Sequence, residues 1–129
     1  MCCAAYLDYV YILMYIYSRI LSVRPMTYRI EITPTALEAL KAIADRRTRS
    51  AIVRRIDTLA EEPETQGKSL RGLLTGFLSA RAAGQRYRVV YTVDNTRKLV
   101  LVYMVGIRRE DSRRDVYALA ERLVQRGLI

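Results

Sequence analysis

The 129-residue chain contains no histidine and no tryptophan, and its two cysteines are neighbours, Cys2 and Cys3. Without histidine the chain lacks the usual general base, the commonest metal ligand and every Ser-His or Cys-His nucleophile pair. Two adjacent cysteines give neither a metal-site spacing nor a disulfide framework. We therefore expect no cofactor and no metal. The rest of the chain is free of cysteine, which fits a reducing cytoplasm.

Positive charge, in contrast, is abundant. The chain has 22 Lys+Arg against 13 Asp+Glu and a formal net charge of +9. Its length and its 51% hydrophobic residues predict one small packed domain. A basic excess of this size indicates a polyanionic partner, either nucleic acid or a protein with an acidic segment. The alternative is a soluble protein that is basic without such a partner.

The first 25 residues differ from the rest because they are apolar and rich in tyrosine, with Asp8, Arg19 and Arg24 as their only charges. Their uncharged run, 9–18, is short of the ~20 residues that a membrane-spanning helix needs, so we expect no membrane. Met26 opens a segment that reads as a domain start. We interpret 1–25 as an apolar extension from a start codon assigned too far upstream, and 26–129 as the domain. The alternatives are an apolar helix that packs on the domain or on a partner, and a membrane anchor.

The patterns in 26–129 predict the order β-α-α-β-β-β-α. A strand begins at Tyr28, Thr33 and Pro34 open a helix, and a second helix over about 47–62 ends before Pro63. A loop is expected over 63–76, strands over 77–83, 85–94 and 98–106, and a final helix over about 112–126. The predicted class is α+β: a small antiparallel sheet, formed by the N-terminal strand and a three-strand meander, with a helical hairpin on one face and a C-terminal helix.

Alternation along "RAAGQRYRVVYTVD" separates two faces of one strand. Val89, Tyr91 and Val93 are expected to face the helical hairpin. Arg86 and Arg88 then point to the opposite face, and Arg81 on the preceding strand lies beside them. Guanidinium groups gathered in this way suit phosphate oxygens, because each donates two parallel hydrogen bonds.

A second arginine cluster follows the last strand in "GIRREDSRRDVY". Arg108 is expected close to Arg88, whereas Arg113 and Arg114 look like a solvated turn. The alternative for Arg88 and Arg108 is a structural pairing with acidic residues, for which Glu110, Asp111 and Asp115 are available. Tyr117 is equally suited to packing in the last helix and to contact with a base or phosphate.

The segments "LRGLLTGFLSARAAGQRYRVVYTVD", "VYMVGIRRED" and "DVYALAERL" resemble the RelE/ParE superfamily of toxins from bacterial type II toxin–antitoxin modules. The resemblance spans about Thr27 to Leu123 and leaves out residues 1–25. It implies a compact microbial-ribonuclease-like RelE fold and a cognate antitoxin protein as partner. In the RelE branch it also implies a toxin that enters the ribosomal A site and cuts the mRNA there.

The functional residues of the RelE branch carry over in part: two arginines as Arg88 and Arg108, and a tyrosine as Tyr117. A lysine pair on the first strand of the meander does not carry over, and Arg81 is the only cation there. We therefore predict Arg81, Arg88, Arg108 and Tyr117 as catalytic. The residues assigned to RNA binding are Arg71, Arg86 and Arg109.

These residues favour a ribosome-dependent mRNA endonuclease that inhibits translation. Arginine, with a pKa above 12, is a poor proton acceptor but a strong stabiliser of charge at phosphorus. One alternative is a ParE-like inhibitor of DNA gyrase, which uses the same scaffold without nuclease chemistry. Another is a degenerate toxin that only binds its antitoxin.

Overall fold

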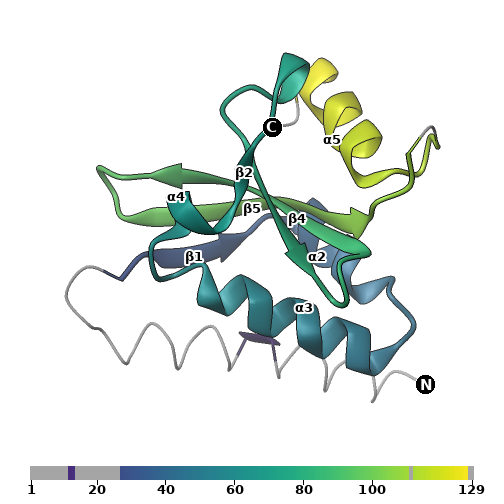
Figure 1. Cartoon of the computed structure of the whole chain (residues 1–129), viewed down its shortest axis with the longest axis horizontal. Helices are drawn as coiled ribbons and strands as arrows, with labels where there is room; N and C mark the ends of the chain where they lie inside the picture. Colours follow the sequence, from purple (N-terminus) through teal and green to yellow (C-terminus); the bar gives the residue numbers. More distant parts are fainter. Residues whose placement is uncertain (1–11, 14–26, 111, 128–129) are drawn as a thin grey trace.

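The computed structural model describes residues 12–13, 27–110 and 112–127 (Figure 1). Its elements, in chain order, are β1 (Arg29–Ile32), α2 (Pro34–Lys41), α3 (Arg46–Thr58), α4 (Pro63–Gln66), β2 (Lys68–Ser69), the 3-10 helix η1 (Gly72–Leu74), β3 (Leu78–Ala82), β4 (Tyr87–Asp94), β5 (Leu99–Ile107) and α5 (Val116–Gln125). The predicted α+β class is confirmed.

The strands form one sheet in the order β1-β5-β4-β3-β2. The antiparallel meander β3-β4-β5 is as predicted. The prediction that the whole sheet is antiparallel is wrong, because β1 pairs with β5 in parallel. The segment between β1 and the meander contains α2, α3, α4, β2 and η1, and a connection of that length can return the chain to either end of the sheet. The short strand β2, which pairs with β3, lies inside the segment 63–76 that was predicted as a loop.

Side-chain caps set where the helices begin. Thr33 accepts a hydrogen bond from the backbone N–H of Ala36 at 3.2 Å, as expected of an N-cap. Asp45 caps α3. The last helix starts at Val116, later than predicted, because the carboxylate of Asp115 caps it. The second helix ends earlier than predicted, at Thr58, because Leu59 is its C-cap and the side chain of Gln66 donates to the Thr58 carbonyl at 2.5 Å.

The sheet separates two apolar cores (Figure 1). On one face, Leu40 of α2 and Ile56 of α3 pack with Val89 and Tyr91 of β4. The residues that pack together on the other face come from α5, β4 and β5: Val116, Ala120, Val90 and Met104. The predicted division of β4 into two faces is confirmed. The strand β5 is covered on both sides as well, because Val100 and Val105 lie in the first core and Met104 lies in the second.

Ile12 is buried in the core that α2 and α3 cover, whereas Leu13 is exposed. Residues 1–11 and 14–26 lie outside the described residues, and with them the interpretation of 1–25, which stays a prediction. Among the helices that the structure describes, none has the length and apolar character needed to cross a bilayer.

Tyr91 is the largest fully buried side chain, and its hydroxyl donates to the carbonyl of Pro63 at 2.6 Å. Gly67 makes room for that hydroxyl, since a Cβ at this position would lie 2.3 Å from it. Burial raises the pKa of Tyr91 to about 12. The hydroxyl therefore joins the helical layer to β4 in its protonated form.

We expect Tyr91→Phe to lower the free energy of unfolding at pH 8 by about 1–1.5 kcal/mol, because the buried Pro63 carbonyl loses its donor. Above pH 10 the unfolded wild-type chain loses the Tyr91 proton while the folded chain keeps it up to about pH 12. Wild-type stability therefore falls by up to ~1.4 kcal/mol per pH unit in that window, and its advantage over Tyr91→Phe shrinks. Urea unfolding at pH 8, 10 and 11 measures this. Tyr103→Phe is the matched control, and an equal effect there would refute the assignment.

Candidate functional site

Arg81 and Arg88 stand directly opposite each other on β3 and β4. Val90, on the same side of β4 as Arg88, packs in the core beneath α5, so both arginines belong to the α5 side of the sheet. On the other side of Arg88, its partner in β5 is Gly106. We call the set of Arg81, Arg88, Arg108 and Tyr117 the arginine face.

The β3–β4 turn orients the two arginines. Ala83, Gly84 and Gln85 have φ values of 48°, 71° and 72°, so the chain reverses through three consecutive left-handed residues. Arg88 donates from Nη1 to the carbonyls of Gln85 and, at 3.1 Å, of Tyr87. Arg81 reaches the side chain of Gln85 at 3.5 Å. Within the described residues Arg88 has no acidic partner, so the pairing considered with Glu110 or Asp115 is not found, and Asp111 lies outside the described residues.

Arg108 reaches the same end of the sheet because its backbone N–H donates to the carbonyl of Arg86 at 2.7 Å. Gly106 permits the close approach of α5, since a Cβ there would lie 3.2 Å from Cβ of Val116. A side chain at position 106 would therefore push the start of α5 away from β5. This approach sets Tyr117, the next residue of α5, over the sheet.

Asp115 is a buried carboxylate that accepts three hydrogen bonds. Oδ2 binds Nη1 of Arg108 at 2.6 Å and the backbone N–H of Tyr117 at 3.2 Å, and Oδ1 binds the backbone N–H of Arg109 at 2.6 Å. The bond to Asp115 raises the pKa of Arg108 above its ordinary value. Glu110, which is exposed, lies 3.7 Å from Nη2 of Arg108. The acidic partner considered for Arg108 is therefore present, and it is mainly Asp115.

Tyr117 has a contact on its ring and another on its hydroxyl. The guanidinium of Arg108 lies 4.5 Å from the ring centroid, a cation–π arrangement. The hydroxyl is hydrogen-bonded to Oγ of Ser79 on β3 at 2.7 Å. The ring also packs against the core beneath α5. The ring of Tyr117 thus packs in the core while its hydroxyl forms a polar contact on β3.

The three residues assigned to RNA binding are all exposed: Arg71, Arg86 and Arg109. Arg86 precedes β4 and Arg109 follows Arg108, so both flank the arginine face. Arg71 precedes η1, at the end of β3 remote from Arg81, and the structure does not bring it to the arginine face. Their contacts with RNA stay a prediction.

Sequence reasoning gave no role to two residues near the arginine face, Lys68 and Ser79, and it considered Asp115 as an ion-pair partner but not as a helix cap. An aspartate directly before an amphipathic helix is an N-cap signal, so Asp115 was within reach of the sequence. Ser79 lies two residues before Arg81 and thus on the same side of β3. No pattern marks Lys68, because β2 is only two residues long.

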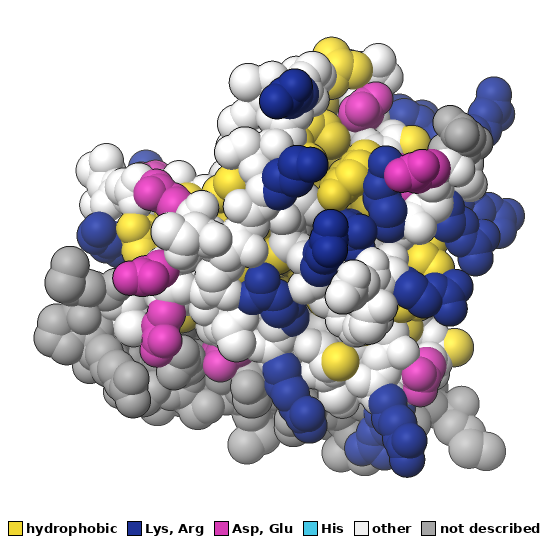
Figure 2. All heavy atoms as spheres, viewed as in Figure 1, with side chains coloured by type: hydrophobic (Ala, Val, Ile, Leu, Met, Phe, Trp, Pro, Cys, Tyr) yellow, Lys and Arg dark blue, Asp and Glu magenta, His cyan; other side chains and the backbone are white. Residues whose placement is uncertain are grey.

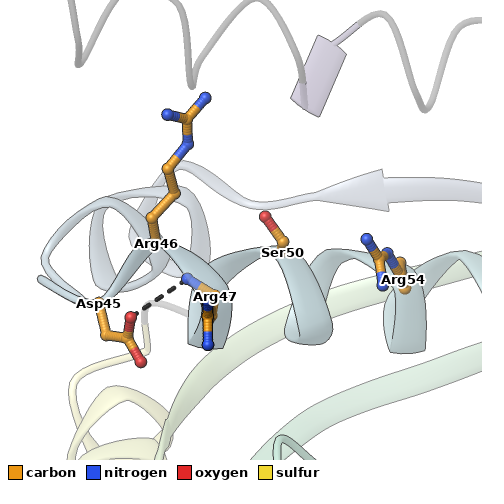
Figure 3. A pocket seen from close by; sticks show the side chains of 5 residues that line it. All are labelled: Asp45, Arg46, Arg47, Ser50 and Arg54. Carbon is orange, nitrogen blue, oxygen red and sulfur yellow. Dashed lines mark hydrogen bonds between the residues drawn. The ribbon is translucent and has the colours of Figure 1, made fainter.

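Lys and Arg side chains gather on the face shown in Figure 2, from the start of α5 across the β3–β4 hairpin to α3. On α3, an open pocket of about 670 Å³ is lined by Asp45, Arg46, Arg47, Ser50 and Arg54. Figure 3 shows Asp45 turned toward the backbone nitrogen of Arg47, to which it is hydrogen-bonded at 3.2 Å. Arg54 also lines a second open pocket, together with Arg55 of α3 and with Arg81 and Gln85 of the β3–β4 hairpin, so the basic surface of α3 adjoins the arginine face. Among the described residues, no group of acidic or cysteine side chains is placed to hold a metal ion.

The fold agrees with comparisons to known proteins. Residues 30–112 match the family described as the ParE toxin of type II toxin–antitoxin system, parDE. The chain therefore belongs to the RelE/ParE superfamily and is the toxin of a type II toxin–antitoxin system, as the resemblance implied.

One relative is toxin RelG of Mycobacterium tuberculosis, 32% identical over 92 residues, which are 71% of this chain and 98% of that protein. A chain in the crystal structure of the M. tuberculosis toxin–antitoxin complex RelBE2 is 32% identical, with a TM-score of 0.58 over 64% of this chain and 99% of that one. A mutant of the Escherichia coli toxin RelE in the free state, at 20% identity, shares the fold, with a TM-score of 0.58 over 81% of this chain and 100% of that one.

We expect Asp115→Ala to destabilise the chain by about 3 kcal/mol, because it leaves the partly buried Arg108 guanidinium unpaired and removes the N-cap of α5. Asp115→Asn keeps one acceptor for the helix and should cost less. Thermal unfolding of the two variants measures the difference. Asp45→Ala, which removes the exposed cap of α3, is the control for capping alone. A loss no larger than that of Asp45→Ala would contradict the role of Asp115 as a buried ion-pair partner.

Proposed function

We propose that this toxin cleaves mRNA on the translating ribosome. The observation that carries the proposal is the meeting of Arg81, Arg88 and Arg108 at one end of the sheet, with Arg108 over the ring of Tyr117. These groups come from β3, β4, the end of β5 and α5, so only the folded chain assembles them. Several guanidinium groups on one face suit the phosphates of a single RNA strand.

The chemistry of these groups favours charge stabilisation over proton transfer. Cleavage through attack of the RNA 2′-hydroxyl on phosphorus needs alignment, a proton acceptor and neutralisation of the developing charge. Arginine supplies the last of these and cannot act as a base at neutral pH. In a chain without histidine, proton transfer falls to Tyr117, a carboxylate, solvent or the ribosome. A site of this kind depends on positioning, which the ribosomal A site supplies to the bound mRNA.

Arg108 is suited to this task even though Asp115 engages it. The ion pair uses Nη1, so the other N–H donors of the guanidinium remain for a phosphate. The side chain keeps 29% of its surface exposed. Asp115 and the ring of Tyr117 therefore fix the position of a guanidinium that still reaches solvent, and a fixed donor stabilises charge without reorganising during the reaction.

A second candidate function follows from the matched family, whose description is that of a ParE toxin. In that case the chain inhibits DNA gyrase as a binding module, and the arginine face has no reaction to perform. The convergence of cations on a hydroxyl pair favours the nuclease, because gyrase binding does not require it.

We further propose a cognate antitoxin as the partner of this chain in the cytoplasm. Relatives were crystallised as toxin–antitoxin complexes, including RelBE2 of M. tuberculosis. An acidic or amphipathic segment of the antitoxin is complementary to the net charge of +9 and would mask the basic face.

Purified toxin distinguishes the two functions. In one reaction it is added to ribosomes translating a defined mRNA, and the cleavage products are mapped by primer extension. In the other it is added to gyrase with relaxed plasmid, and supercoiling is followed. The nuclease proposal expects cleavage that depends on the ribosome and unchanged supercoiling. Intact mRNA together with inhibited supercoiling would instead support the gyrase function.

We expect Arg88→Gln to lower the rate of mRNA cleavage by about 10²- to 10³-fold, the usual effect of removing one donor to transition-state charge. Arg88→Lys should retain part of the rate, since it keeps the charge but loses the bidentate fork. Arg97→Gln is the matched control, because Arg97 is exposed at the β4–β5 turn, the far end of β4 from Arg88. Cleavage by Arg88→Gln at the rate of Arg97→Gln would remove Arg88 from the site.

A further inference from the structure

We propose that Lys68 of β2 belongs to the same site and binds an RNA phosphate next to the Tyr117 hydroxyl. The inference rests on the proposed nuclease function and adds a residue to it. It is carried by the pairing of β2 with β3, by the hydrogen bond between Ser79 and Tyr117, and by the free charge of Lys68.

The sheet fixes the side of the molecule on which Lys68 lies. In the antiparallel pair β2–β3, Lys68 is directly opposite Ser79, and opposite residues of such a pair share one face. Ser79 lies on the α5 side, because its Oγ binds the hydroxyl of Tyr117. Leu70, two residues after Lys68, packs in the core beneath α5, which places Lys68 on the same side.

The backbone of Lys68 lies close to the hydrogen-bonded hydroxyls of Ser79 and Tyr117. Opposite residues of an antiparallel pair have Cβ atoms about 5 Å apart. The Oγ of Ser79 is in turn hydrogen-bonded to the Tyr117 hydroxyl at 2.7 Å. The long, flexible stem of lysine can therefore bring the ammonium group to a phosphate held at Tyr117. Arg81, two residues after Ser79 on the same side of β3, extends the positive surface toward the arginine face.

The ammonium of Lys68 is not engaged by another group of the described residues, whereas the protein itself holds part of the guanidinium groups of Arg88 and Arg108. Lys68 is exposed, and its ammonium forms no ion pair or hydrogen bond within the described part of the chain. Arg108 is paired with Asp115, and Arg88 donates to two backbone carbonyls of the β3–β4 turn. An unpaired ammonium acts as a compact point charge for phosphate, whereas the arginines supply planar forks.

A lysine on an edge strand has a second explanation, since β2 is the last strand of the sheet. Charged residues on edge strands prevent pairing with other chains. That role requires a charge on β2 but no contact with RNA. It therefore predicts that loss of Lys68 promotes self-association and leaves the cleavage rate of the monomer unchanged.

The test compares Lys68→Gln, Lys68→Arg and wild type in ribosome-dependent cleavage of a defined mRNA, with single-turnover rates. Arg97→Gln is the control for net charge, because it removes one exposed cation at the β4–β5 turn, the far end of the hairpin from Arg88. Thermal unfolding and light scattering check that each variant is folded and monomeric.

We expect Lys68→Gln to cleave about ten- to hundredfold more slowly than wild type and Lys68→Arg to recover most of the rate, with Arg97→Gln unchanged. If wild type cleaves the mRNA and Lys68→Gln cleaves it at the same rate, the role of Lys68 is overturned and the nuclease proposal stays intact. Equal losses in Lys68→Gln and Arg97→Gln overturn it too, since they reflect net charge. Absence of cleavage by wild type overturns both proposals.

Discussion

The buried carboxylate of Asp115 holds three parts of the site in one arrangement. It accepts from the backbone after β5, from the first turn of α5 and from the guanidinium of Arg108. A buried charge is costly unless it is paired and hydrogen-bonded, and here a cation and two N–H groups meet that need. The ring of Tyr117 stacks on the same guanidinium. The positions of Arg108 and Tyr117 are therefore not independent, and both follow from how Asp115 is satisfied.

The sheet imposes a second constraint, because both of its faces are covered. Alternate residues of β4 enter different cores: Val89 and Tyr91 pack under α2 and α3, and Val90 packs under α5. Cations are tolerated only where this apolar cover ends, since an unpaired guanidinium inside either core would lose its hydration. Arg81 and Arg88 thus lie beside the β3–β4 turn, and Arg108 joins them at the end of β5. The apolar cores concentrate the positive charge at one end of the sheet.

The sequence could predict the features that depend on local periodicity. Alternation alone placed Val89 and Tyr91 opposite Arg88, and Thr33 was recognised as a helix cap. The sequence could not predict the parallel pairing of β1 with β5, because strand direction depends on the path by which the connecting helices return the chain to the sheet. The sequence could not predict the position of Lys68 either, since a strand of two residues is too short to show alternation and lies between two glycines. For Arg108 the sequence offered Glu110, Asp111 and Asp115 as partners, and the choice of Asp115 depends on the loop turning back to cap α5.

In the proposed reaction, the hydrogen-bonded hydroxyls of Ser79 and Tyr117 belong to the contribution of the protein, and the ribosome contributes the rest. A tyrosine held by a neighbouring hydroxyl and stacked beneath a guanidinium is fixed in place, so it can orient a phosphate without moving. The carboxylates of Asp115 and Glu110 face Arg108. The arginines of the site stabilise negative charge but are poor proton acceptors. In the proposed function the folded chain therefore contributes binding and charge stabilisation, and the reaction proceeds only where the RNA strand is already held in a reactive geometry. This dependence explains why a small basic protein with an exposed site of this kind would act on mRNA in the ribosome and leave free RNA intact.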